Sequence, residues 1–370
     1  MSFIITILAA LLVFSAVIAI HEFGHFAVAK LCGIQVNEFS IGMGPVLWKK
    51  NRKGTQYSLR ALPVGGFVAL EGEESPESQQ AEAARAAQEQ PAPETEAPVQ
   101  PVGVPLNEAP VWQRVLVMVA GAVMNFVLGF VVLVILIAAQ NEPITSKTIY
   151  AIQDGALCGQ TGLQAGDQVL AVNGRRCFVA NDILYELVRT KSYSADFTVL
   201  RNGQKVQLPG VQFDTWQDEK GETHMSIGFS VYGLEKTPGN VLREAGNSVL
   251  YYGRIVFTSL VDLLRGRESI NNLSGPVGIV SAIGQAASYG WQDLLELLAL
   301  ITVNLGIFNL LPFPALDGGK VVFLVIEGVT GHAVPEKLQS VLTLATFGLL
   351  FGLMLFATYN DILRLITGTV

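Results

Sequence analysis

The sequence predicts a polytopic α-helical membrane protein with about four transmembrane helices, a membrane-associated β-hairpin region and one inserted soluble α+β domain. The chain has 370 residues, of which 50% are hydrophobic and 15% charged, whereas about 25% of residues are charged in soluble proteins. The apolar residues gather in long runs, as expected for helices that cross a bilayer. Polar stretches with turn residues separate these runs and predict loops or domains in water.

The predicted membrane helices are runs with few charges, each near the roughly 20 residues that a spanning helix needs. The second run contains Gly121 and Asn125, which serve either close helix packing or a hydrogen bond between helices. The first run has no basic residues before it, so we interpret it as a retained span although Ala27–Ala29 resembles a signal-peptide cleavage site. The four predicted spans are Ile4–Ala29, Val115–Ala139, Leu294–Leu311 and Val341–Ala357.

Two different segments are predicted between the first two spans. Phe39–Leu70 alternates apolar residues with glycines around a basic turn at Lys49–Gly54, which indicates β-hairpins near the membrane surface. Glu71–Asn107 is rich in Glu, Gln, Ala and Pro and lacks the apolar residues of a core, so we expect a disordered acidic linker. The net charge of −7 argues against nucleic acid as a partner.

A soluble block is predicted at about Ile144–Tyr232, between the second and third spans. Gly162–Gly174 combines a glycine-bounded turn, a buried strand and an Asn-Gly hairpin, and Asn181–Thr190 then suits a short helix. The string resembles a PDZ domain of the type associated with bacterial proteases. The resemblance implies binding of an extended peptide or chain end by strand addition, and the alternative is a spacer that limits access.

Two further features concern the chain outside the spans. Val241–Leu264 has apolar residues at helical spacing and predicts an amphipathic helix that lies on the membrane or packs on the spans. Cys32, Cys158 and Cys177 lack the paired spacing of a metal site. Cys158 and Cys177 fall in the soluble block, where they either form a disulfide or remain free thiols.

These patterns divide the chain into a first span, a β region, a linker, a second span, a soluble domain, an amphipathic segment, a third span, and a fourth span with the C-terminus. The corresponding boundaries are 1–38, 39–70, 71–109, 110–143, 144–233, 234–290, 291–320 and 321–370.

The first span ends in a motif that suits metal chemistry. His21 and His25 are four residues apart, so on a helix they share one face. Two imidazoles at this spacing bind one zinc ion, and Glu22 lies beside them to act on a bound water. Ionisable groups at membrane depth are costly and usually functional. The motif therefore predicts a hydrolytic zinc site within the membrane.

A catalytic zinc ion needs a third protein ligand. Cys32, His224 and His332 are candidates, together with a carboxylate at the end of a span. Asp317 is better placed than these, because it follows the third span in Asn309–Gly319, where Pro312 and Pro314 break the helix. Irregular backbone at membrane depth persists only where protein buries it or where it lines a wet cavity.

These motifs together resemble the bacterial site-2 protease family, zinc metalloproteases of regulated intramembrane proteolysis (peptidase family M50). The first span carries His-Glu-x-x-His and a later one is followed by Asn-x-x-Pro-x-Pro-x-Leu-Asp-Gly. Phe39–Pro45, Pro63–Phe67, the PDZ-like insertion and Ser274–Gly278 extend the match, whereas the acidic linker matches no feature of the family. The resemblance implies that His21, His25 and Asp317 bind Zn2+ and that Glu22 is the catalytic acid/base.

The resemblance also implies a site for an unwound substrate. Asn309 would hold the substrate backbone, although its amide has the alternative of satisfying backbone groups freed by Pro312. Gly65 and Gly66 are candidate substrate-binding residues, because the strand-rich region around them suits pairing with an extended chain. The expected function is cleavage of the transmembrane segment of a pre-trimmed single-span protein, such as an anti-sigma factor or a signal-peptide remnant.

The distribution of basic residues predicts how the protein lies in the membrane. Lysines and arginines follow the first and third spans, which places these loops in the cytoplasm. We therefore expect a multi-pass protein of the cytoplasmic (inner) membrane, with the PDZ-like domain and both termini outside and the zinc site near the cytoplasmic side. The alternative functions are a membrane metal-binding protein without protease activity and a PDZ scaffold.

Overall fold

The computed structural model describes residues 3–73, 102–190, 192–219 and 221–367. The chain divides into two compact units. The first unit comprises residues 1–129 and 256–370, and the second comprises residues 130–255. Most of the predicted acidic linker lies outside the described residues. The C-terminal end of this segment is ordered, since Val104 pairs with Ile34 and Leu106 is buried in η1 (Leu106–Glu108). The prediction of disorder is wrong there.

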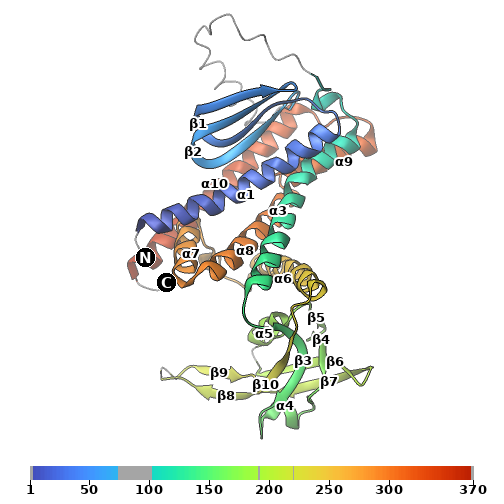
Figure 1. The fold of residues 1–370 in the computed structure, drawn as a ribbon, viewed down its shortest axis with the longest axis vertical. Coiled ribbons are helices and arrows are strands. Elements are labelled where there is room, and N and C mark those ends of the chain that lie inside the picture. Colours follow the sequence, from blue (N-terminus) through green and yellow to red (C-terminus); the bar gives the residue numbers. More distant parts are fainter. Residues whose placement is uncertain (1–2, 74–101, 191, 220, 368–370) are drawn as a thin grey trace, which may run out of the picture. The chain divides into compact units, whose positions relative to one another are not determined.

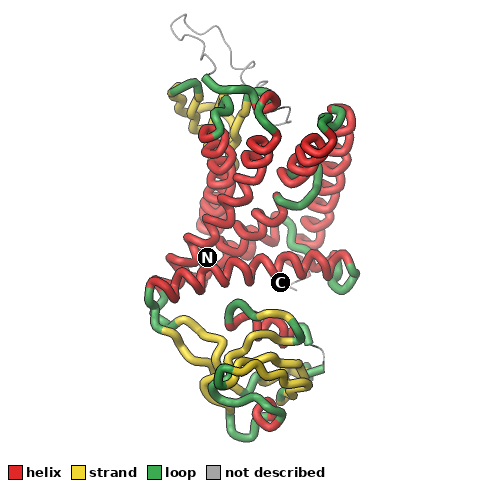
Figure 2. Tube along the Cα trace, turned by 90° about the vertical axis from the view of Figure 1, so that its right-hand side faces the viewer, coloured by secondary structure: helices red, strands yellow, loops and turns green. Residues whose placement is uncertain are grey.

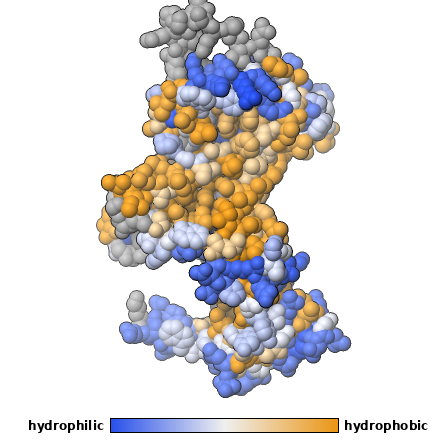
Figure 3. Space-filling model, in the orientation of Figure 1, coloured by the Kyte–Doolittle hydropathy of each residue, from blue (hydrophilic) through white to orange (hydrophobic). Residues whose placement is uncertain are grey.

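The described residues contain four helices that are long and apolar enough to cross a membrane, which confirms the predicted number. Each is longer than its predicted run or shifted by a few residues. Their exposed side chains are largely apolar, and Figure 3 shows this surface as a broad hydrophobic zone over the helices. These helices are α1 (Phe3–Leu31), α3 (Val111–Ala139), α8 (Trp291–Asn309) and α10 (Glu336–Thr367).

Two shorter helices were not predicted. α7 (Pro276–Tyr289) begins directly after Gly275 and α9 (Asp317–Thr330) ends at Gly331, which adopts the left-handed conformation with φ 73°. The Asp361 carboxylate of α10 accepts a hydrogen bond of 2.7 Å from the Gly278 backbone N–H in the first turn of α7. A Cβ atom at Gly278 would lie 2.8 Å from an Asp361 oxygen. The Gly275–Gly278 segment therefore gives the carboxylate room to cap α7.

The β region forms a sheet beside α1 (Figures 1 and 2). The two strands are β1 (Val36–Arg52) and β2 (Thr55–Leu70), and both are unusually long. The first part of β1, residues 36–41, pairs with β2 on both sides: with residues 66–70 on one side and with residues around 56–59 on the other. Residues 66–70 are consequently an edge of the sheet. The Ser15 hydroxyl of α1 donates a hydrogen bond to the Pro63 carbonyl, which fastens β2 to the helix.

A buried polar network stabilises the interior of this sheet. Arg60 lies 2.8 Å from Glu38 and donates a 2.9 Å hydrogen bond to the Ser40 hydroxyl. The Ser58 hydroxyl donates to the same Glu38 oxygen at 2.6 Å. Since a buried charge is tolerated only when it is paired, this network fixes the register of the two strands.

The second unit contains a five-strand path, β10-β3-β4-β6-β7, with β5 paired to β4 and with β8 and β9 forming a separate hairpin. The predicted Asn-Gly hairpin is present, with φ 49° at Asn173 and 75° at Gly174. The strands are β3 (Ile144–Ile152), β4 (Gln168–Val172), β5 (Arg175–Arg176), β6 (Ser194–Arg201), β7 (Gln204–Gln212), β8 (Asp214–Gln217), β9 (Thr223–Ser226) and β10 (Phe229–Leu234).

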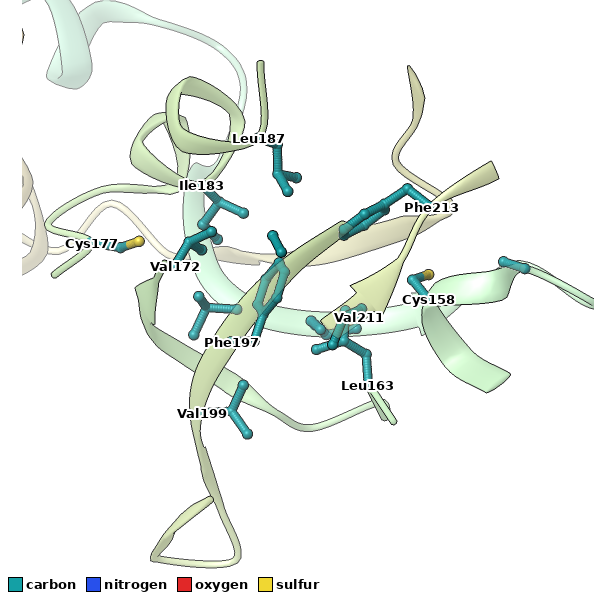
Figure 4. Packing of buried hydrophobic residues seen from close by; sticks show 14 residues of the cluster. Cys158, Leu163, Val172, Cys177, Ile183, Leu187, Phe197, Val199, Val211 and Phe213 are labelled. Carbon is teal, nitrogen blue, oxygen red and sulfur yellow. The ribbon is translucent and has the colours of Figure 1, made fainter. Parts of the chain in front are cut away.

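The core of this unit packs against two short helices, α4 (Leu157–Gln160) and α5 (Ala180–Val188). Figure 4 shows Phe197 at its centre, with Ile183 and Leu187 on the side of α5. Cys158 and Cys177 are both buried free thiols, so the disulfide alternative is wrong. The predicted amphipathic helix is α6 (Pro238–Leu264), and η2 (Ile270–Asn272) follows it.

Candidate metal centre

The two histidines of α1 point in the same direction, as their spacing predicts. The ring centroids of His21 and His25 lie 4.7 Å apart and the Nε2 atoms 3.2 Å apart. Each residue is only 8% exposed. Two buried imidazole nitrogens that face each other cannot both present lone pairs, so a proton or a metal ion must lie between them.

Asp317 completes the cluster. Its Oδ2 atom lies 3.2 Å from His21 Nε2 and 3.4 Å from His25 Nε2. One ligand atom from each of the three residues lies within 4.8 Å of the others. Oδ2 accepts no hydrogen bond from any described residue although it is buried. Sequence reasoning selected this carboxylate, and the structure brings it to the histidines.

The chain break between α8 and α9 positions Asp317. α8 ends at Asn309, and the backbone folds tightly back so that Asp317 is the first residue of α9. A Cβ atom at Gly318 would lie 2.3 Å from the Leu311 carbonyl oxygen, and one at Gly319 would lie 2.2 Å from that of Phe313. Only glycine fits at these two positions, so the Asp-Gly-Gly sequence is a requirement of the turn.

One face of α3 holds both imidazoles. His25 Nδ1 lies 2.8 Å from the Val117 carbonyl oxygen, and this acceptor fixes the ring with its proton on Nδ1 and its Nε2 toward Asp317. His21 Nδ1 lies 3.3 Å from the Asn125 amide. Between these contacts, a Cβ atom at Gly121 would lie 2.3 Å from His25 Nε2. Gly121 therefore makes room for the rings.

The buried donor atoms fit a zinc ion. Two imidazoles and one carboxylate are the protein ligands of many catalytic zinc sites, in which a fourth position stays open for water or substrate. The orphaned Asp317 oxygen and the inward-facing Nε2 atoms satisfy this donor set. A bound divalent cation would neutralise the carboxylate and remove the conflict between the two ring nitrogens.

The other predicted third ligands lie elsewhere. Cys32 packs in a hydrophobic cluster with Leu70 and Val117. His224 belongs to the second unit, stacks on Trp216 and contacts Asp218. His332 is exposed and bonds to the backbone of Thr330.

Of the remaining predicted site residues, Asn309 contacts the cluster, Gly66 lies near Glu22, and Gly65 faces the sheet. Gly66 lies next to Glu22, since a Cβ atom built on it would be 3.8 Å from Glu22 Cγ. Gly65 has φ 84° and faces the Met43 side chain. The Asn309 amide lies 3.4 Å from His21 Nδ1 and Nε2.

Sequence reasoning missed the part that α3 plays. Asn125 was noted as an amide within a span, and the signal that distinguishes its role is its spacing of four residues from Gly121, which places both on one helix face. Val117 contributes a backbone carbonyl and therefore leaves no signal in the sequence.

Comparison with known proteins agrees with this geometry. The family model described as "Peptidase family M50" matches residues 9–353. The chain belongs to peptidase family M50. It is 28% identical to "Regulator of sigma-W protease RasP" of Bacillus subtilis, over 98% of this chain and 99% of that protein. It is 33% identical to "Putative zinc metalloprotease CPE1693" of Clostridium perfringens, over 96% of this chain and 98% of that protein.

As an M50 peptidase, the chain is a multi-pass membrane metalloprotease that depends on zinc. Membership of this family favours the protease over the metal-binding and scaffold alternatives. It confirms the resemblance drawn from the two motifs.

Proposed function

We propose that this M50 peptidase is an intramembrane endopeptidase that cuts the transmembrane segment of single-span proteins already shortened by another protease. The cluster of His21, His25 and Asp317 carries the proposal, because it joins a helix long enough to span a membrane to the turn after another such helix. A protease whose active site is built this way meets a peptide bond that is itself within the bilayer.

We assign the zinc ligands as His21 Nε2, His25 Nε2 and Asp317 Oδ2. The zinc ion held there would supply Lewis acidity, lowering the pKa of a water molecule to about 7 and polarising the scissile carbonyl. Glu22 accepts the proton of the attacking water and donates it to the leaving amine nitrogen. The Glu22 side chain lies beside Gly66 of the sheet, since a Cβ atom there would be 3.8 Å from Glu22 Cγ, and this neighbourhood supports its assignment.

Asn125 is assigned the role of orienting His21. Its Oδ1 atom is buried and has no hydrogen-bond partner among the described residues, while its Nδ2 atom lies 3.3 Å from His21 Nδ1. Rotation of the amide by 180° exchanges its oxygen and nitrogen, so Oδ1 accepts the Nδ1 proton. His21 then presents a free Nε2, as His25 does through Val117.

The substrate lies as an added strand along the edge formed by residues 66–70. Among the described residues this edge pairs with the rest of the sheet on one side only, and it adjoins Glu22 at Gly66. A peptide bond inside a helix is shielded by its own hydrogen bonds, so the substrate must unwind before cleavage. Gly65 and Gly66 allow close approach of the substrate backbone, and the Asn309 amide binds that backbone beside His21.

The substrate class follows from the relatives. One of them is named as a regulator of sigma-W, so anti-sigma factors are the first substrates to test, followed by signal-peptide remnants. Residues 144–233 are proposed to be a PDZ-like domain that recognises the new chain end. We place this domain outside the cytoplasmic membrane and the metal centre near its cytoplasmic side, because the basic residues follow α1 and α8.

The test uses Glu22→Gln in the full-length protein. Cleavage of a reporter transmembrane segment should fall by at least about 100-fold, the range of a lost general acid/base, whereas bound zinc and the melting temperature should stay at wild-type values. The fragments that accumulate when Glu22→Gln is expressed in its host identify the substrates. If purified Glu22→Gln cuts the reporter at the wild-type rate, the proposed mechanism is wrong.

A further inference from the structure

A pocket with basic walls lies at the end of α1. In the sheet it adjoins the segment around residues 56–59, which pairs with residues 36–41 on the side away from the substrate edge at residues 66–70. It has a volume of about 510 Å³, and its lining includes three cationic side chains, Lys30, Arg52 and Lys53, together with Tyr57. Lys30 is partly buried, and Arg52 and Lys53 are exposed at the pocket rim. None of the three cations has a carboxylate partner among the residues that the structure describes.

The walls of this pocket are held in place by side chains with no part in the metal centre. Gln35 donates a 2.7 Å hydrogen bond to the Gly54 carbonyl and accepts hydrogen bonds from the Val102 and Gly103 N–H groups at 2.9 and 3.1 Å. The Lys30 ammonium donates to the Lys53 carbonyl at 3.5 Å. These bonds join the end of α1, the turn of the hairpin and the segment after the linker, so the pocket is built from three separate parts of the chain.

The turn itself has an unusual residue. Lys53 adopts φ 49° and Gly54 φ 72°, the conformation of a tight hairpin turn in which the first position normally carries Asn, Asp or Gly. Lysine in the left-handed region is uncommon and strained, and such strain often marks a functional position. Lys53 is also one of the residues that line the pocket.

The surroundings of the pocket suit the membrane surface. It lies in the last turn of α1, a candidate span, beside Leu31, which is 85% exposed. In the same sheet, exposed Leu47 and Trp48 come directly before the basic turn. Apolar and aromatic side chains followed by lysines and arginines are typical of the level at which phospholipid headgroups lie.

We propose that this pocket binds an anionic phosphate group, at the level where the headgroup of an acidic phospholipid lies. Lys30 and Arg52 neutralise the phosphate, and Lys53 adds a third positive charge at the rim. Binding there would fasten the β1–β2 turn and the end of α1 to the membrane surface.

The experiment measures affinity from the rise in melting temperature of the full-length protein in detergent on addition of dioleoyl phosphatidylglycerol. Dioleoyl phosphatidylcholine and inorganic phosphate are added in separate series. The test variant is Lys30→Gln with Arg52→Gln, and the matched control is Lys49→Gln with Lys50→Gln, which removes the same charge from the same region outside the pocket lining. The single variants Arg52→Gln and Lys50→Gln repeat the comparison at exposed sites, where folding is not at risk.

We expect the test variant to bind phosphatidylglycerol at least about tenfold more weakly than the control variant, because Lys30 and Arg52 line the pocket and would pair with the phosphate directly, whereas Lys49 and Lys50 contribute only the general attraction of basic residues to an acidic surface. The same selective loss for inorganic phosphate, without one for the lipid, would identify a free phosphate as the ligand. Equal weakening in test and control variants would show general charge attraction and overturn the proposal, as would no weakening in either.

Discussion

At the scale of single residues, the metal centre depends on groups that hold the imidazoles as well as on the ligands. His25 is oriented by a main-chain carbonyl, and His21 by the side chain of Asn125. A histidine ligand binds metal well only when its second ring nitrogen has a partner that fixes the tautomer and the ring plane. Of these two partners, only the Asn125 side chain can be removed by substitution, because the other partner is a backbone carbonyl.

Asn125→Ala should weaken zinc affinity by about 10- to 100-fold, the usual effect of removing such a partner. Competition with a chelator of known affinity measures this change on the purified protein. Thr302→Ala is the control, because the Thr302 hydroxyl donates to the Asn125 backbone carbonyl at 3.1 Å and does not touch the ring. Equal zinc affinities in Asn125→Ala and Thr302→Ala would show that the amide does not orient His21.

At the scale of the elements, close approach of α1 and α3 creates the space in which the cluster lies. A Cβ atom at Gly24 would lie 2.4 Å from the Ala120 carbonyl oxygen, and the one at Gly121 would meet both imidazoles. Small residues at the contact let two membrane helices pack backbone to backbone. The two glycines thus determine how near the histidines come to the face of α3.

Gly121→Ala should therefore lower the zinc content of the purified protein together with its melting temperature, because the new methyl group must displace His25 or separate the helices. Gly348→Ala on α10 is the matched control, since no other described part of the chain lies within 4 Å of its added Cβ. There the substitution should be neutral or stabilise the helix by up to about 1 kcal/mol. Full zinc binding by Gly121→Ala would refute this account of the contact.

The core of the second unit leads to a prediction about pH. Burial raises the pKa of the Cys177 thiol from 9.0 to about 12, with a smaller contribution from the nearby Asp182 carboxylate. The folded state therefore holds this proton more tightly than the unfolded state. The stability contributed by the protonated thiol is complete below pH 9 and is lost as the pH rises from about 9 to about 12.

Comparison of the wild type with Cys177→Ala tests this pH dependence, because the variant has no thiol to ionise. The difference in free energy of unfolding between the two proteins should change over this range in the direction that disfavours the wild type. Denaturation curves at successive pH values measure the difference. A constant difference between pH 9 and 12 would contradict the assignment.

At the scale of the whole molecule, the proposed zinc site links α1 to α9, which are far apart in the chain. A ligand that binds only the folded state stabilises it, by about 2.7 kcal/mol when its concentration is 100 times its Kd. The metal should therefore contribute to stability as well as to catalysis.

Removal of zinc by a chelator should abolish cleavage and lower the melting temperature, and added zinc should restore both. The chelator should lower the melting temperature of Glu22→Gln by as many degrees as that of the wild type, because this variant keeps all three proposed ligands. Asp317→Ala should be nearly insensitive to the chelator. A chelator effect on Asp317→Ala as large as that on the wild type would mean that the metal lies elsewhere.

The sequence by itself determined the features that depend on local spacing. The lengths of the apolar runs predicted the four membrane helices, and the four-residue spacing of His21 and His25 predicted one shared helix face. The Asn-Gly turn of the second unit followed from conformations that few residues adopt. Each of these depends on backbone geometry within a few residues, which periodicity and residue type express directly.

Only the tertiary structure decided what the distant parts of the chain contribute. It brought Asp317 rather than Cys32 to the histidines, gave α3 the task of holding both rings, and kept Cys158 apart from Cys177. It also ordered the end of the linker through Gln35 and placed the sheet edge of residues 66–70 beside Glu22. These contacts depend on how helices pack and how strands pair across long separations, and no local pattern in one sequence specifies that geometry.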